Sequence, residues 1–268
     1  MAGFLGFLNY QKEGPGIEKD APKKKTFIVF FETFFRNFWK FTSINFVFSA
    51  ISLPVLTNGL AAAGITNVTR NIARDRHSFG LSDFFETIKK NLKQSLCVGI
   101  INAFITALLA FCLFFYFRSG GAIGTIGLGI TIALTFVFFV MGYYIWTLMI
   151  TFNFTIKQLY ANSFKFVFVN IGKNLLCTLC ILLVYGIYIA VLMLFPTYFV
   201  LMMELMIAMF TLPAFRYLLI QYFTFPAIKK YVIDPYYREH PDADVEKRRD
   251  LGLDVENQSE NGTEGLGI

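Results

Sequence analysis

Charged residues are scarce in this sequence, and their scarcity excludes an ordinary water-soluble domain. Only 16% of the 268 residues are Asp, Glu, Lys or Arg, whereas soluble domains carry about a quarter. Apolar residues make up 56% of the chain and aromatic residues 18%. The composition therefore predicts an integral membrane protein.

Residues that commonly carry out chemistry are also scarce. The two histidines, His77 and His240, stand in separate polar stretches, which does not favour a metal site. Cys177 and Cys180 form an isolated CxxC inside an apolar segment, where packing explains them better than zinc or redox chemistry. The sequence holds no nucleophile–base–acid set, dinucleotide fingerprint or phosphate-binding loop. We therefore expect no enzymatic activity, no cofactor and no metal.

Long apolar segments recur along the chain, and a helix that crosses a bilayer needs about 20 such residues. We expect about six crossings in an all-α helical bundle, with the first crossing entering the membrane near Phe38. The second is short, and is either a tilted helix, a re-entrant element or a span completed by residues up to Ala73. The expected crossings are residues 26–53, 55–68, 95–117, 123–151, 174–195 and 198–223.

The basic residues predict the orientation of these crossings. With six spans, nearly every Lys and Arg falls on the side that holds the loops 70–94 and 155–173, and Arg118 is the only charge opposite. Basic loops stay in the cytoplasm, so both termini are expected there. The predicted parts are an N-terminal cytoplasmic segment (1–25), a membrane helical domain (26–230) and a charged, largely disordered cytoplasmic tail (231–268).

Residues 79–94 are predicted to form an amphipathic helix at the membrane surface. Ser82 or Asp83 is expected to cap it. The lysines of its last turns are a candidate docking surface for another protein, and anchoring of the next span is the alternative. These lysines are Lys89, Lys90 and Lys93, and the apolar positions at helical spacing are Phe84, Phe85, Ile88, Leu92 and Leu96.

Three polar side chains are expected inside the membrane. Glu204 either handles a proton or a solute, or is held by neighbouring polar groups, because a buried carboxylate is costly in lipid. Asn45 and Asn102 are candidates to line a central cavity, although a hydrogen bond between helices is their default role. Pro213 is expected to kink the last span near Glu204.

Residues 30–105 resemble the YesL family, also called DUF624, of bacterial membrane proteins. The GPG at residues 14–16 also fits this family. The resemblance covers the first three expected spans and extends to the rest mainly through the layout of spans. The residues that carry it are Leu53, Pro54, Thr57, Gly59, Ala61, Arg74, Asp75, Phe79, Asp83, Phe84, Phe85, Lys90, Asn91, Lys93 and Gln94.

The resemblance implies a multi-pass protein of the bacterial cytoplasmic membrane. Such proteins are commonly encoded beside carbohydrate ABC-transporter genes, and the family supplies no catalytic residues. Neither the loop 70–94 nor the loop 155–173 carries the EAA-type motif by which a sugar permease contacts its ATPase. The chain is therefore not expected to be a standard permease subunit.

Three functions remain open at this point. The first is an accessory or regulatory protein of carbohydrate uptake, with ABC-transporter subunits and the lipid bilayer as partners. The second is a self-sufficient transporter or channel that uses Glu204, and the third is a membrane scaffold or sensor. Nucleic acid is not an expected partner, because the basic residues flank apolar spans and form no single patch.

Overall fold

The computed structural model describes residues 26–240, and every regular element within them is helical. The prediction of an all-α membrane bundle is confirmed. The expected N-terminal segment 1–25 and the tail beyond residue 240 lie outside the described residues. The elements are α1 (Thr26–Arg36), α2 (Phe38–Ser52), the 3₁₀ turn η2 (Val55–Thr57), α3 (Asn58–Ala73), α4 (Leu81–Ser119), α5 (Gly121–Thr151), α6 (Ile156–Val169), α7 (Ile171–Leu194), α8 (Tyr198–Phe210), α9 (Leu212–Ile228), the π-turn η3 (Lys229–Ile233) and α10 (Asp234–Glu239).

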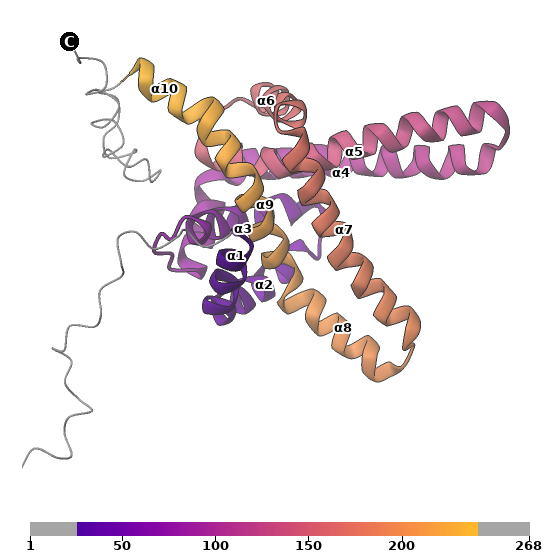
Figure 1. Cartoon of the computed structure of the whole chain (residues 1–268), viewed down its shortest axis with the longest axis horizontal. Helices are drawn as coiled ribbons and strands as arrows, with labels where there is room; N and C mark the ends of the chain where they lie inside the picture. Colours follow the sequence, from indigo (N-terminus) through magenta and orange to yellow (C-terminus); the bar gives the residue numbers. More distant parts are fainter. Residues whose placement is uncertain (1–25, 241–268) are drawn as a thin grey trace, which may run out of the picture.

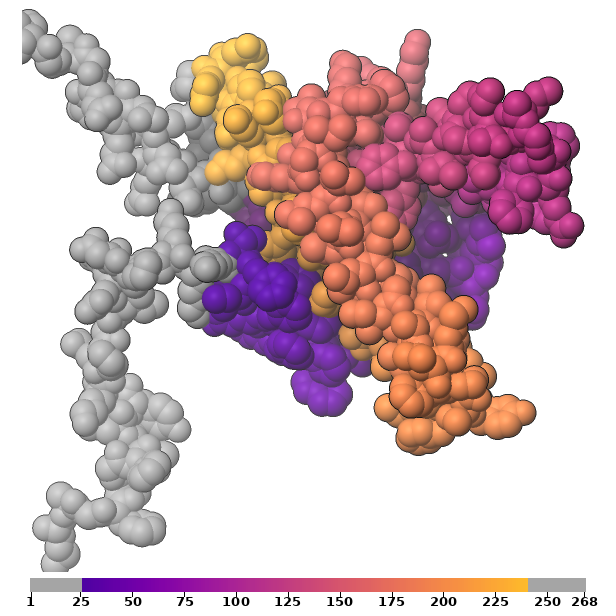
Figure 2. Space-filling view, turned by 45° about the vertical axis from the view of Figure 1, so that its right-hand side comes forward, coloured from indigo at the N-terminus to yellow at the C-terminus, as the bar shows by residue number. Residues whose placement is uncertain are grey.

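Two helical hairpins project in different directions from a central body, as Figures 1 and 2 both show. The body contains α1, α2, α3 and α9, while α4 with α5 and α7 with α8 form the projecting arms (Figure 1). The arms carry large apolar side chains on their surface, among them Phe111, Phe114 and Phe117 on α4 and Leu182 on α7. Surfaces of this kind suit lipid or the helices of another membrane protein.

The number of membrane-spanning helices differs from the six expected. Within residues 26–240, α4, α5 and α7 are long and apolar enough to cross a membrane. The helices on either side of Thr211 make a fourth span if the pair, bent by 45°, counts as one. The first two expected spans are α2 and α3, with 15 and 16 residues, which is shorter than a typical span.

Other helices of the protein surround much of α3. It packs against α2, α4, α5 and α9, and its residues from Ala61 to Thr66 are all buried. The chain divides at Asn37, beside the predicted position of membrane entry near Phe38. If α2 and α3 are both left out, the number of crossings falls by two and stays even. The basic segments therefore keep the common side that the sequence predicts for them.

Small residues bring α3 and α4 into close contact, as the sequence predicts for the Ala-rich segment. A Cβ atom added at Gly99 of α4 would lie 2.9 Å from the Cα atom of Gly59 on α3. A Cβ atom added at Gly64 would lie 2.7 Å from the ring of Phe84. Side chains larger than hydrogen at these positions would force the two helices apart.

One loop prediction is corrected by the structure. Residues 155–173 hold helix α6, which opens with a capping box in which the Thr155 side chain and the Gln158 side chain each accept a backbone hydrogen bond. The last helical segment continues from α9 through η3 and α10 to Glu239.

Candidate functional site: the arginine pocket between α3 and α4

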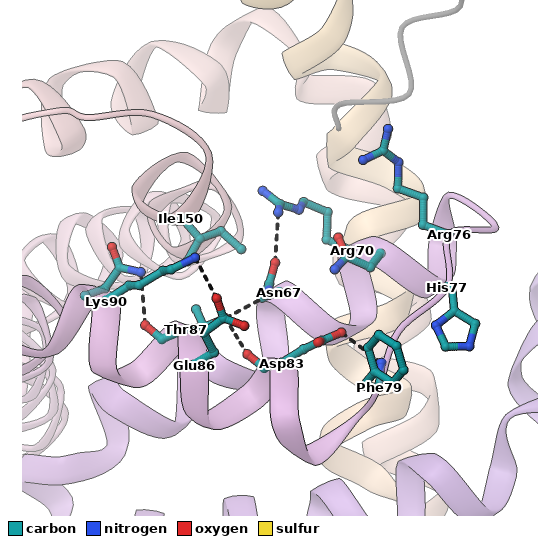
Figure 3. Close-up of a pocket in the computed structure, with 12 residues that line it drawn as sticks. Asn67, Arg70, Arg76, His77, Phe79, Asp83, Glu86, Thr87, Lys90 and Ile150 are labelled. Atoms are coloured by element: carbon teal, nitrogen blue, oxygen red, sulfur yellow. Dashed lines mark hydrogen bonds and ion pairs between the residues drawn. The ribbon is translucent and has the colours of Figure 1, made fainter. Parts of the chain in front are cut away.

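A polar pocket with a volume of about 450 Å³ lies where the chain leaves α3 and turns into α4 (Figure 3). We call it the arginine pocket. Basic, acidic and amide side chains meet in it, and most come from a single stretch of sequence. Its lining is Asn67, Arg70, Asn71, Arg76, His77, Phe79, Asp83, Glu86, Thr87, Lys90, Asn91 and Ile150.

The loop between α3 and α4 is tied to the first two helices. Arg36 forms an ion pair of 2.7 Å with Asp75, whose backbone adopts the left-handed conformation at φ 51°. Lys40 Nζ donates a 2.7 Å hydrogen bond to the carbonyl of Ser78. Gly80 ends the loop at φ 65°, a conformation that favours glycine. These contacts fix the loop that carries Arg76 and His77.

The start of α4 differs from the capping arrangement expected from the sequence. The helix begins at Leu81, and Gly80 occupies the N-cap position without a side-chain cap. Asp83 in the first turn instead accepts hydrogen bonds from the Ser78 hydroxyl (2.7 Å) and the Phe79 backbone N–H (3.0 Å). The carboxylate of Asp83 is therefore engaged in holding the loop against the helix.

Arg70 is held on the wall of the pocket by neutral groups. Its two terminal nitrogens donate to Thr151 Oγ1 (2.7 Å) and Asn67 Oδ1 (2.8 Å), and Asn67 in turn donates to Thr87 Oγ1 (Figure 3). The Nε of Arg70 is buried and has no hydrogen-bond partner among residues 26–240. Burial, and secondarily the charge of Arg76, lower the pKa of Arg70 to about 10.

Arg74 is a second partly buried cation beside the pocket. Its guanidinium lies 4.4 Å from the centre of the Phe225 ring, and in the described part of the chain neither terminal nitrogen has a hydrogen-bond partner. Burial lowers its pKa to about 9, with further contributions from Arg76 and Arg70. Arg70, Arg74 and Arg76 thus repel one another at the end of α3.

The predicted docking lysines lie on the surface of α4. Lys89, Lys90 and Lys93 are all exposed, and Lys90 also lines the pocket and pairs with Glu86 at 2.7 Å. The apolar stripe expected on this helix is divided between two environments. Phe84 and Ile88 are buried in the body, whereas Phe85 and Leu92 are exposed. The helix therefore packs on α3 through part of its apolar face.

Asn45 has the structural role that was its default interpretation. Its side chain is fully buried, donates to the carbonyl of Phe210 (2.8 Å) and accepts from the N–H of Ala214 (2.7 Å). These backbone groups flank the break between α8 and α9, where Pro213 occupies the first turn of α9. Asn45 therefore bridges the bend that Pro213 was predicted to cause.

Asn102 lines a different cavity, of about 300 Å³, together with Arg216 and Tyr217. Its Oδ1 accepts a 2.7 Å hydrogen bond from the hydroxyl of Tyr160. The Nε of Arg216 is buried without a hydrogen-bond partner in the described residues, while its guanidinium lies 5.4 Å from the Phe139 ring centre. This cavity combines amide and cationic groups between α3, α4, α5 and α9.

Glu204 is buried on α8, with 5% of its surface exposed. Its backbone carbonyl accepts a hydrogen bond from the Tyr188 hydroxyl (3.0 Å), and its Oε2 has no partner among the residues described. Glu204 lines neither the arginine pocket nor the cavity at Asn102. The structure thus places the three predicted intramembrane polar residues in three separate environments.

Sequence reasoning missed the arginine pocket, although it noted the arginines as the start of a basic loop. The available signal was the cluster of basic residues at Arg70, Arg74 and Arg76 between two apolar segments, of which Arg70 and Arg76 line the pocket. Within residues 26–240 no three His, Cys, Asp or Glu side chains gather as a metal site requires.

Part of the chain matches a known protein family. The family model described as "Protein of unknown function, DUF624" matches residues 41–113 and confirms the resemblance predicted from the sequence. The matched segment contains every residue that lines the arginine pocket except Ile150. No curated protein and no solved structure matches the chain.

Proposed function

Residues 41–113 match the DUF624 family model, and from that premise we propose that the protein is an accessory or regulatory membrane protein of carbohydrate uptake. It acts by contact with subunits of an ABC-type transporter in the bacterial cytoplasmic membrane. The carbohydrate context comes from the genes that commonly neighbour this family. The mode of action comes from the surface of α4.

The observation that carries the proposal is the group of exposed lysines on α4, a helix that kinks at Asn91, between Lys90 and Lys93. Lys89, Lys90 and Lys93 are exposed on α4, while Phe84 of the same helix is buried against Gly64 of α3. A row of charges held on a packed helix loses little conformational freedom when a partner binds. An acidic surface on a transporter subunit is the partner that complements it.

Purification of the tagged protein from native membranes tests this function. In cells grown on complex glycans, we expect transporter subunits to co-purify with the wild type and to be lost from the triple variant K89A/K90A/K93A. The matched control is K157A/K165A/K173A, which removes three exposed lysines of α6 and α7 from the same predicted side. Equal recovery from both triple variants, or no transporter subunit with the wild type, would contradict the proposal.

A second function is favoured by one observation, the cavity that holds Asn102 and Arg216. A cation whose buried Nε has no hydrogen-bond partner in the described residues suits passage of a small anionic solute through this cavity. In this function the protein is a self-sufficient transporter, and Glu204 lies outside the cavity. Proteoliposomes test it: solute flux that falls in R216Q but not in E204Q supports transport through this cavity, and no flux with the wild type excludes it.

A further inference from the structure

One charged side chain lines the cavity at Asn102, and it has no anionic partner in the part of the chain described. Arg216 of α9 is that side chain, and among residues 26–240 no Asp or Glu lines the cavity. Its guanidinium lies 5.4 Å from the ring centre of Phe139 and 5.9 Å from that of Tyr217. An arginine within a membrane-spanning region commonly pairs with a negative group or marks a ligand site. An anion is therefore the partner that Arg216 lacks.

Two polar side chains of α4 add hydrogen-bonding groups to the same lining. The Oδ1 of Asn102 accepts from the hydroxyl of Tyr160 at 2.7 Å, which leaves the amide nitrogen of Asn102 to donate to a ligand. Thr106 lies one turn further along α4 and brings a hydroxyl group. These groups complement a ligand that accepts hydrogen bonds.

The cavity opens on a surface of α4 that suits lipid. Thr106 and Ala110 line the cavity and are exposed. Phe104 and Leu108 are exposed on the same stretch of this helix, which is long and apolar enough to cross a membrane. A ligand can therefore reach the cavity from the bilayer.

The rest of the lining suits a hydrocarbon chain. Leu109, Leu113 and Phe138 are among the apolar residues around a volume of about 300 Å³. Arg216 lies about 20 Å along α9 from Lys229, the basic residue that follows this helix, because each residue rises about 1.5 Å. The phosphate of a phospholipid stays at the membrane surface, whereas the carboxyl group of a fatty acid enters hydrocarbon as the neutral acid. This depth favours the fatty acid.

We propose that the cavity binds a fatty acid from the bilayer, with its carboxylate on Arg216 and its acyl chain directed past Thr106 and Ala110 toward lipid. A guanidinium and a carboxylate fit each other through two parallel N–H···O bonds. The inference is independent of the role in carbohydrate uptake, since it rests on the cavity alone. It also differs from the transport function considered for the same cavity, because the ligand comes from the membrane and its binding requires no flux.

Tryptophan fluorescence tests the proposal, because Trp146 lines the cavity and the other tryptophan, Trp39, is 80% exposed. In the full-length variant W39F in neutral detergent, stearic acid with bromine atoms on its chain is expected to quench Trp146 saturably. Unbrominated stearic acid is expected to relieve the quenching. The brominated methyl ester, which carries no charge, is expected to need at least tenfold more. The variant W146F reports partition into the micelle through Trp39, where we expect no saturation.

Variants in the W39F background locate the binding. R216Q is expected to weaken it at least tenfold and R216K less, because lysine keeps the charge without the paired N–H groups. R118Q is the matched control, since Arg118 lies at the far end of α4. A110F fills the mouth of the cavity without changing a charge and is also expected to weaken binding at least tenfold. Its control is A107F, an exposed position of α4 outside the cavity lining.

Melting of each variant without fatty acid verifies folding. Absence of saturable quenching, equal affinity for the acid and its methyl ester, or equal effects of A110F and A107F would overturn the proposal. Displacement of the brominated acid by acetate as readily as by stearic acid would also overturn it, because acetate has the carboxylate without the chain. Solute flux in proteoliposomes that persists while fatty-acid binding fails would reject this inference and leave the transport function standing.

Discussion

Replacing Asn45 tests how the bent helix pair α8–α9 is held to the body of the protein. In N45L the side chain keeps its size but loses both the donor to Phe210 and the acceptor for Ala214. Both contacts connect α2 to backbone groups that the break near Pro213 leaves outside the regular helix. The position is fully buried, so water does not replace the lost partners.

The expected loss of stability follows from the two backbone groups that N45L leaves without a hydrogen-bond partner, the Phe210 carbonyl and the Ala214 N–H. Each buried group without a partner costs about 1–3 kcal/mol in a soluble protein, while hydrogen bonds between membrane helices average about 0.6 kcal/mol. Because both groups are main-chain and lie at a helix break, we expect a loss near the middle of this range, about 2–3 kcal/mol. N45D keeps the acceptor for Ala214 and loses only the donor, but it buries a carboxyl group, so its loss is also expected to be substantial.

The assay is reversible unfolding in mixed micelles, followed by circular dichroism as the fraction of denaturing detergent rises. N102L serves as the control, because Asn102 accepts one hydrogen bond from Tyr160 and is only partly buried. We expect N102L to cost less than half as much as N45L. A loss below about 0.5 kcal/mol for N45L, or a larger loss for N102L, would refute the bridging role assigned to Asn45.

Two further predictions concern packing and the buried carboxyl group. G99L is expected to destabilise the protein by about 3 kcal/mol or more, because its Cβ would meet the backbone of Gly59, whereas G129L is expected to be tolerated because nothing lies within 4 Å of a Cβ there. Yield and melting temperature in detergent compare the two, and equal behaviour would contradict the close α3–α4 contact. E204Q is expected to change stability by less than about 1 kcal/mol, since in the described structure Oε2 makes no hydrogen bond. A large loss in unfolding measurements would instead show that the carboxyl group is held by a partner.

Much of the architecture was predictable because it depends on local composition. The apolar length of α4, α5 and α7 identifies them as membrane-crossing helices wherever they lie in the fold. Pro213 predicted a bend by removing a backbone donor, and the bend occurs beside it. The small residues of α3 predicted a close helix contact, which Gly59 and Gly99 make. The family resemblance also lay in residues adjacent along the chain.

The tertiary structure decided which polar groups meet. Composition does not show whether a short apolar helix is buried among other helices, and α3 is buried because α2, α4, α5 and α9 surround it. Asn45 finds its partners at Phe210 and Ala214, about 165 residues away, and no local pattern encodes that distance. The proximity of Arg70, Arg74 and Arg76, whose charges lower the pKa values of Arg70 and Arg74, likewise depends on how the chain turns after α3. Helix length and bending follow from neighbouring residues, whereas satisfaction of a buried polar group depends on the whole chain.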